Sequence, residues 1–173
     1  LRALHDELGA HADLVQMLAA RDRVYARYGQ AFAPENLPQL TADEYLSFLR
    51  FENNAHWSGI HRYGSRTTSD MPALRQALGV LTDEQRPLAG RYDEATGGAI
   101  KGIGPAIATP ILHVVYPDRY GVWNSQSHAG LQAIGALPRF ERGWTDGQKY
   151  KAVNETLVAL AEALRIDLWT LDA

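Results

Sequence analysis

Apolar residues recur every three or four positions along most of the chain, which is the spacing that puts them on one face of an α-helix. A first helix is predicted over residues 12–28, and Gly29 is expected to end it. Its inward side chains are predicted to be Leu14, Leu18, Tyr25 and Tyr28. A shorter helix, expected to follow a loop over residues 65–70, is predicted to bury Leu74, Leu78 and Leu81.

Three pairs of residues, spaced three apart, have the composition of a capping box, in which each side chain binds a backbone N–H at the start of a helix. The pairs are Thr41 with Glu44, Thr82 with Gln85, and Thr145 with Gln148. The helix after the first pair is expected to turn Tyr45, Leu46, Leu49 and Phe51 inward. The helix after the second pair is expected to fade at Gly97 and Gly98. The last helix is expected to bury Tyr150, Val153, Leu157, Leu160 and Leu164.

The remaining segments complete a helical chain. Residues 34–38 and 117–121 contain prolines and are predicted to form a loop and a turn, and a helix over 125–134 is expected to end at Gly135. No run of alternating polar and apolar residues is long enough to demand a sheet. The sequence therefore predicts an all-α, single-domain helical bundle spanning residues 1–173, with a helix–hairpin–helix element at its centre.

This central element is a Gly-x-Gly turn that joins two predicted helices. It consists of Lys101, Gly102, Ile103, Gly104, Pro105 and Ala106. Glycine permits a positive φ and lets a phosphate approach the backbone, and the N–H groups at the start of the next helix attract an anion. Pro105 suits the first helical position, whereas Pro110, further along, is unfavourable inside a helix. A Gly-x-Gly turn on its own is more often a tight turn between two packed helices than a phosphate-binding hairpin.

In its wider context, the segment 102–128 resembles the helix–hairpin–helix DNA glycosylase superfamily. In that family an apolar helix and a turn follow the hairpin, and a catalytic aspartate begins the next helix. Ala106 falls on the position of the lysine of the bifunctional members, and Asn124 falls on that of the aspartate. The resemblance therefore implies a monofunctional enzyme without lyase activity.

Asn124 is the larger departure from the family, because cleavage of an N-glycosidic bond creates a positively charged sugar that a carboxylate stabilises. A neutral amide supplies no charge, although its carbonyl can hold a water molecule. On sequence grounds Glu52 is the best substitute for the missing carboxylate, and Asp93 and Asp118 are weaker candidates. The alternative interpretation of Glu52 is an exposed helix carboxylate with no catalytic role.

The chain also resembles a set of bacterial phage-defence domains in residues 51–59, 102–109, 120–125 and 167–171. Some of those domains are modules of modification-dependent restriction proteins, and one stand-alone relative removes α-glucosylated hydroxymethylcytosine from phage DNA. The resemblance implies a modified base in phage DNA as the target. The segment 51–57 is similar to the pocket and wedge segment of the glycosylase family.

These comparisons define the candidate site. The expected catalytic residues are Asn124 and Glu52. The expected substrate-binding residues are Asn53, Asn54, His56, Trp57, His61, Trp123, Gln126 and His128. The expected DNA-binding residues are Lys101, Gly102, Ile103, Gly104 and Ala106. Trp57 is the better candidate for stacking on an extruded base, whereas the apolar neighbours of Trp123 favour a core position. Gln126 and His128 fit a base pocket and an exposed helix start equally well.

Composition narrows the function further. The chain has no cysteine, which excludes disulfides, thiolate metal sites and a cysteine nucleophile. No metal or cofactor is expected, because the spacing of His56 and His61 suits no common metal motif. The net charge of −3 argues against a broad nucleic-acid surface and allows a compact one. No segment is apolar enough for a membrane span, residues 1–9 do not look like a signal peptide, and a cytoplasmic location is expected.

Three functions remain open at this point. The first is a monofunctional glycosylase that excises a modified base, and the second is a module that flips and reads such a base without cutting it. The third is a helical interaction domain that does not bind DNA, which the acidic balance favours.

Overall fold

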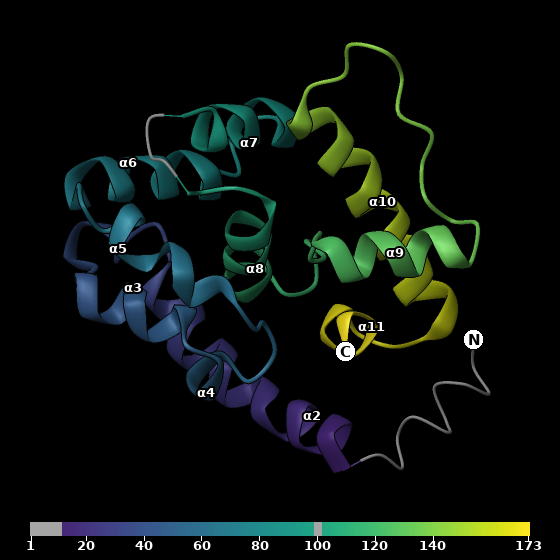
Figure 1. Cartoon of the computed structure of the whole chain (residues 1–173), viewed down its shortest axis with the longest axis horizontal. Helices are drawn as coiled ribbons and strands as arrows, with labels where there is room; N and C mark the ends of the chain where they lie inside the picture. The colour runs from purple at the N-terminus through teal and green to yellow at the C-terminus, as the bar shows by residue number, and fades with distance from the viewer. Residues whose placement is uncertain (1–11, 99–101) are drawn as a thin grey trace.

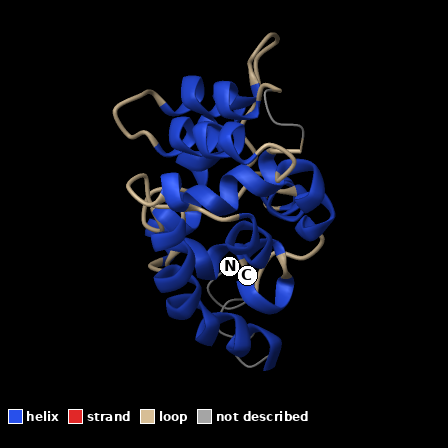
Figure 2. Ribbon diagram, turned by 90° about the vertical axis from the view of Figure 1, so that its left-hand side faces the viewer, coloured by secondary structure: helices blue, strands red, loops and turns tan. Residues whose placement is uncertain are grey.

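The computed structural model describes residues 12–98 and 102–173, which fold into helices and loops without any strand (Figure 1, Figure 2). The all-α class predicted from the sequence is therefore confirmed for this part of the chain. The longer helices are α2 (Ala12–Val24), α3 (Ala42–Leu49), α6 (Met71–Thr82), α7 (Leu88–Thr96), α8 (Pro105–Val115), α9 (Ser125–Ala133) and α10 (Asp146–Leu164). The short helical segments are η1 (Tyr25–Gly29), η2 (Leu37–Gln39), α4 (Phe51–Asn54), η3 (Ile60–Tyr63), α5 (Gly64–Thr67) and α11 (Leu168–Asp172).

Helix α8 lies at the centre of the molecule, with α3 and α5 on one side and α9 and α10 on the other (Figure 1). Residues 107–114 of this helix are all buried, which accounts for its apolar sequence. Pro105 occupies its first position, as predicted. The helix continues through Pro110, whose ring is buried in the core, although the missing N–H leaves the Ala106 carbonyl without its usual helical donor.

Most of the predicted helix starts are confirmed. Thr41 and Glu44 form a complete capping box before α3, and Thr145 and Gln148 form another before α10. The three leucines expected to be inward on α6 are buried, and α7 ends at Gly97. These starts depend on residues only three positions apart, so a local pattern is enough to identify them.

Three local predictions are wrong. Gly29 does not end the first helix, since helical backbone continues through Ala31. A Cβ on Gly29 would lie 2.7 Å from the Val114 carbonyl oxygen, so glycine at this position permits close packing of the helix against α8. Phe51 is 48% exposed and does not point inward. Thr82 is buried and donates its hydroxyl to the Leu78 carbonyl, so it caps no helix.

Two predicted loops contain helical turns: α5 occupies the first part of 65–70, and η2 overlaps the end of 34–38. The predictions that concern residues 1–9, Ile100 and Lys101 lie outside the described residues, and so do the side chains of Leu14 and Leu18. Within the described residues, no helix combines the length and the apolar content needed to cross a membrane.

Helix α11 was not expected from the sequence, and it is fixed by contacts with distant parts of the chain. Asp167 caps its start by accepting from the Thr170 N–H at 2.7 Å, and Arg21 of α2 forms an ion pair with the same carboxylate. Trp169 is fully buried, and its ring centre lies 4.5 Å from that of His56. These contacts dock α11 beside the loop that follows α4.

Buried His113 of α8 is expected to make the fold sensitive to mild acid. Its Nδ1–H donates to the Tyr120 carbonyl at 2.8 Å, which leaves Nε2 to accept from the Tyr25 hydroxyl at 2.9 Å. Burial lowers the pKa of His113 below its ordinary value of 6.5. The unfolded chain therefore takes up a proton at a pH where the folded chain does not, and this contribution to stability is lost as the pH falls below 6.5.

Urea denaturation at pH 7 and pH 5 measures this effect. Between pH 7 and pH 5, the free energy of unfolding should decrease more in the wild type than in His113→Gln, which has no titrating group at this position. Equal slopes in the two proteins would show that His113 is not responsible.

Candidate functional site

Asn124 begins α9 and acts as its N-cap. Its side-chain oxygen accepts from the backbone N–H groups of Gln126 at 2.8 Å and Ser127 at 3.0 Å. The Ser127 hydroxyl in turn accepts from the Asn124 N–H at 2.8 Å. Both lone pairs of the amide oxygen are therefore used by the helix. The group that Asn124 can offer a substrate is its NH₂ donor, and not the carbonyl expected to hold a water molecule.

A pocket of about 390 Å³ lies at the N-terminal ends of α8 and α9, and we call it the Asn124 pocket. It is lined by His56, Trp57, Ser58, Ile60, Arg62, Ala106, Asn124, Ser125, Gln126, Asp172 and Ala173. The pocket brings together five residues that the sequence predicts for the site: His56, Trp57, Ala106, Asn124 and Gln126. The partial positive charge at both helix starts favours a negatively charged or oxygen-rich ligand.

The loop that carries His56 and Trp57 is shaped by Asn54, which is fully buried. The Asn54 amide donates to the carbonyls of Phe48 and Trp57, and its oxygen accepts from the N–H groups of His56 and Trp57. Ala55 adopts a left-handed conformation with φ of 57° within this turn. Asn54 thus positions the pocket wall and has no hydrogen-bonding capacity left for a substrate.

Asp172 of α11 lies on the wall of the Asn124 pocket, beside His56 and Trp57. Its Oδ2 accepts from the Trp57 indole N–H at 2.8 Å and lies 2.9 Å from His56 Nε2. The side chains of His56 and Asp172 are only 2% and 6% exposed. Trp57 is 4% exposed and belongs to the main apolar core, although it also contributes to the pocket lining. A stacking role on an extruded base, expected for Trp57, does not fit this burial.

The central Gly-x-Gly segment is described from Gly102 onward. Gly102 has a φ of 105°, and Ile103 is 4% exposed and belongs to the main core. Gly104 has an extended backbone with φ of −130°, and a Cβ there would meet no atom of the described residues within 4 Å. Among the described residues, neither backbone conformation nor internal packing requires glycine at position 104, and none of them blocks the approach of a ligand to this face. Lys101, predicted to bind DNA, lies outside the described residues.

Arginines border this face of the molecule. Arg62 lines the Asn124 pocket, and a Cβ built on Gly102 would lie 3.7 Å from Arg66 Cδ. Both arginines are exposed, and within the described residues neither forms an ion pair. The lining of the Asn124 pocket therefore holds one exposed arginine, Arg62, together with the carboxylate of Asp172.

Three predicted site residues lie elsewhere. Glu52 is exposed and lines two other hollows with Phe51, and neither hollow includes Asn124. Asn53 and His61 line one of these hollows, and the Asn53 amide donates to the Ser47 carbonyl and hydroxyl. The two hollows and the Asn124 pocket are thus separate. Among the described residues, only Ser58 borders both the pocket and the hollow that contains His61.

Trp123, which comes just before α9, packs against both apolar clusters of the molecule. Its ring is stacked on that of Tyr150, a residue of the main core, with ring centres 6.4 Å apart. The His128 ring lies 6.5 Å from that of Trp123 and does not line the Asn124 pocket. Core packing, the alternative interpretation of Trp123, is the one that its position fits.

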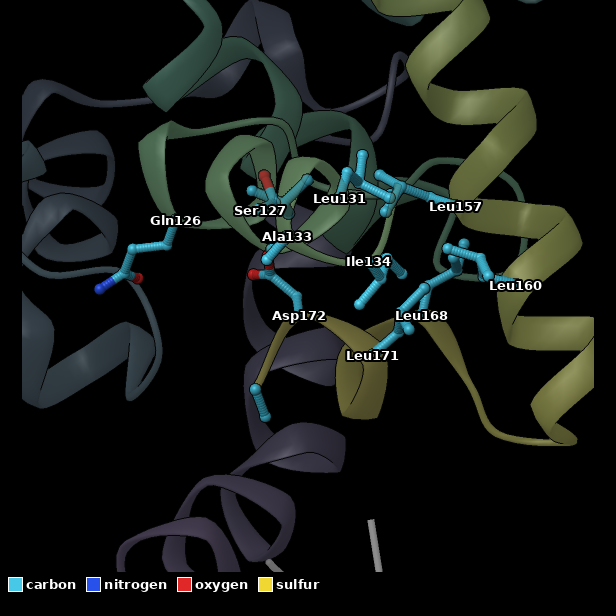
Figure 3. A pocket seen from close by; sticks show the side chains of 14 residues that line it. Gln126, Ser127, Leu131, Ala133, Ile134, Leu157, Leu160, Leu168, Leu171 and Asp172 are labelled. Carbon is cyan, nitrogen blue, oxygen red and sulfur yellow. The ribbon is translucent and has the colours of Figure 1, made fainter. Parts of the chain in front are cut away.

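A larger apolar pocket of about 530 Å³ adjoins the Asn124 pocket and shares Gln126, Asp172 and Ala173 with it. In Figure 3 the leucines of α9, α10 and α11 gather on one side of this second pocket, whereas Gln126 points away from them. Gln126 and Asp172 therefore stand at the boundary between a polar and an apolar compartment.

Sequence reasoning missed Asp172, Arg62 and Ser125 as residues of the pocket. No spacing in the sequence links Asp172 to Trp57, which lies 115 positions earlier in the chain. In the described part of the chain, no group of three or more histidine, aspartate or glutamate residues is placed to hold a metal ion.

Comparison with known proteins adds no relative to this description. No protein family model, no curated protein and no solved structure matches the chain.

Proposed function

We propose that this protein is a monofunctional DNA glycosylase, which hydrolyses the N-glycosidic bond of a modified base. The observation that carries the proposal is the Asn124 pocket, which combines two helix starts, an amide donor, an exposed arginine and a buried carboxylate beside an open Gly-x-Gly turn. An extruded nucleotide presents a phosphate, a sugar and the polar edge of a base, and these groups complement such a lining.

The lining also supports the monofunctional form of this proposal. Lyase chemistry requires an amine that forms a Schiff base with the sugar. Ala106 lies in the pocket wall, and no lysine is among the described residues that line the pocket. Water is therefore the proposed nucleophile, and an intact abasic site is the proposed product.

The proposed target is a modified base of phage DNA, with α-glucosylated hydroxymethylcytosine as the first candidate from the sequence resemblance. The proposed role is antiviral defence in the cytoplasm, where such DNA enters the cell.

A second candidate function is a module that flips and reads a modified base without excising it. The observation that favours it is the capping role of Asn124, whose oxygen is occupied by two backbone N–H groups. The two functions differ in their product, because a reader leaves every base attached to its sugar.

The test is to incubate the purified protein with duplexes that carry the glucosylated base and with matched unmodified duplexes, and then to count abasic sites. Abasic sites on the modified duplex alone support the glycosylase. Tighter binding to the modified duplex without abasic sites supports the reader. The absence of any salt-dependent DNA binding would contradict both and support the interaction domain.

The exposed arginines lead to a separate prediction about affinity. Arg62→Ala and Arg66→Ala should each weaken binding equally on modified and unmodified duplexes, because phosphate contacts do not read the base. Each variant should lower the slope of log affinity against log salt by about 1. Fluorescence anisotropy over a salt series measures this slope.

Arg142 provides the matched control, since it is exposed and does not line the Asn124 pocket. Arg142→Ala should leave affinity and slope unchanged. Equal effects of all three variants would place the DNA on another surface. A weakening confined to the modified duplex would show that the arginines contact the modified base and not the phosphates.

A further inference from the structure

A buried carboxylate from a distant part of the chain reaches the Asn124 pocket. Asp172 comes from α11, and Trp169, one turn earlier on the same helix, is fixed in the core between the rings of His56 and Trp57. The position of Asp172 is thus set by aromatic packing, and its side chain is 6% exposed.

The two oxygens of Asp172 have different surroundings. Oδ2 carries both contacts, accepting from Trp57 Nε1 at 2.8 Å and lying 2.9 Å from His56 Nε2. Within the described residues, no hydrogen bond uses Oδ1. An anchored Oδ2 orients the second oxygen, and Asp172 remains part of the pocket lining. The carboxylate is therefore held rigidly and still has an acceptor for a bound molecule.

The rest of the pocket lacks the charge that the proposed reaction needs. Asn124 is neutral and its oxygen is used by the helix cap. Glu52, the carboxylate expected from the sequence, is exposed and lines other hollows. Asp172 is the one carboxylate side chain among the described residues that line the pocket.

Resting on the proposed function, we propose that Asp172 is the catalytic carboxylate of the glycosylase, and that His56 and Trp57 are its positioning residues. The bond between C1′ and the base nitrogen breaks, and its electron pair leaves with the base. The oxygen of a water molecule bonds to C1′ while Asp172 Oδ1 takes one of its protons. The departing base takes up a proton from solvent, and Asp172 later returns its own proton to solvent. The negative charge of Asp172 stabilises the positively charged sugar during the reaction.

This assignment gives Asn124 the complementary task. Its NH₂ group donates a hydrogen bond to an oxygen of the extruded nucleotide, while Asp172 supplies the charge. The carboxylate of Asp172 and the amide of Asn124 come from different helices, α11 and α9. The reacting centre therefore forms only when α11 is docked.

The experiment compares Asp172→Asn with Glu52→Gln, since both changes remove a carboxylate charge and keep the shape. Single-turnover excision from the modified duplex, duplex affinity and melting temperature are measured for each. Asp172→Asn should keep its affinity and lose excision by about 100-fold or more, because removal of a general base has an effect of that size. Glu52→Gln should keep the wild-type rate.

Chemical rescue separates catalysis from structure. Formate added to Asp172→Ala should restore part of the rate, because a free carboxylate can occupy the vacated space, and formate should not change Glu52→Gln. Where Asp172→Asn does not fold, Asp172→Glu and Asp172→Gln decide the matter, since they have one shape and differ in charge. The glutamate variant should then be at least about 10-fold faster than the glutamine variant.

The failures are distinguishable. A folded Asp172→Asn protein with the wild-type excision rate, or equal rates for the glutamate and glutamine variants, overturns the role of Asp172 and leaves the glycosylase standing. A wild-type protein that produces no abasic site on any modified duplex overturns the proposed function, and the role of Asp172 falls with it.

Discussion

Replacing Asn124 with serine is expected to leave the protein folded and to lower excision of the modified base by about 100-fold. Serine is as good an N-cap as asparagine, so the hydroxyl oxygen should still accept from the first backbone N–H groups of α9. Serine lacks the NH₂ group, which is the part of Asn124 that the helix cap leaves free. Loss of one donor aimed at developing negative charge, such as that on the departing base, typically costs a factor of that size.

Asn124→Ala is the comparison, because alanine removes the cap and the donor together. It should show the same loss of excision and also a loss of about 1 kcal/mol in the free energy of unfolding. Single-turnover rates and urea denaturation give the two quantities for each variant. A serine variant with the wild-type rate would mean that Asn124 only caps α9.

Replacing Glu84 with alanine is expected to destabilise the fold by about 3–5 kcal/mol, the cost of leaving a buried charge without its partner. Arg91 is 1% exposed and donates to Glu84 Oε1 at 2.6 Å and to the Tyr120 hydroxyl. Arg119 forms an ion pair with the other oxygen of Glu84. Since domains of this kind are stable by about 5–15 kcal/mol, the loss is a large share of the total.

Urea denaturation of Glu84→Ala measures this loss. The double variant Glu84→Ala with Arg91→Met should recover most of the stability, because the stranded charge is gone and methionine fills the space. Glu94→Ala is the control, since it breaks the exposed pair with Arg86 and should leave the denaturation midpoint unchanged. A Glu84→Ala protein as stable as the Glu94→Ala protein would show that Arg91 does not depend on Glu84.

The parts of the fold that the sequence predicts well depend on residues close together in the chain. The capping boxes before α3 and α10 are visible because both members of each pair lie within one helical turn. The pair Thr82 and Gln85 has the same composition and caps nothing. Burial of Thr82 under the core lets its hydroxyl bond back to the preceding turn, and only tertiary packing decides this.

Only part of the candidate site could be predicted from the sequence. The Gly-x-Gly turn and Asn124 are visible as local features, and the structure places Asn124 beside Ala106, His56 and Trp57. Polar neighbours suggest that Trp57 is exposed, but Trp169 and Asp172 of α11 cover it. A five-residue helix has too few positions to show a periodic pattern, so the sequence indicates neither α11 nor the carboxylate that it contributes.

The most direct test of the central claim is to identify what leaves the DNA. Duplexes containing α-glucosylated hydroxymethylcytosine are incubated with the protein, small molecules are separated from the DNA, and the free base is quantified by mass spectrometry. We predict free modified base in an amount equal to the abasic sites formed, and none from matched cytosine duplexes. Tight binding of the modified duplex with every base still attached would contradict excision and identify the chain as a reader.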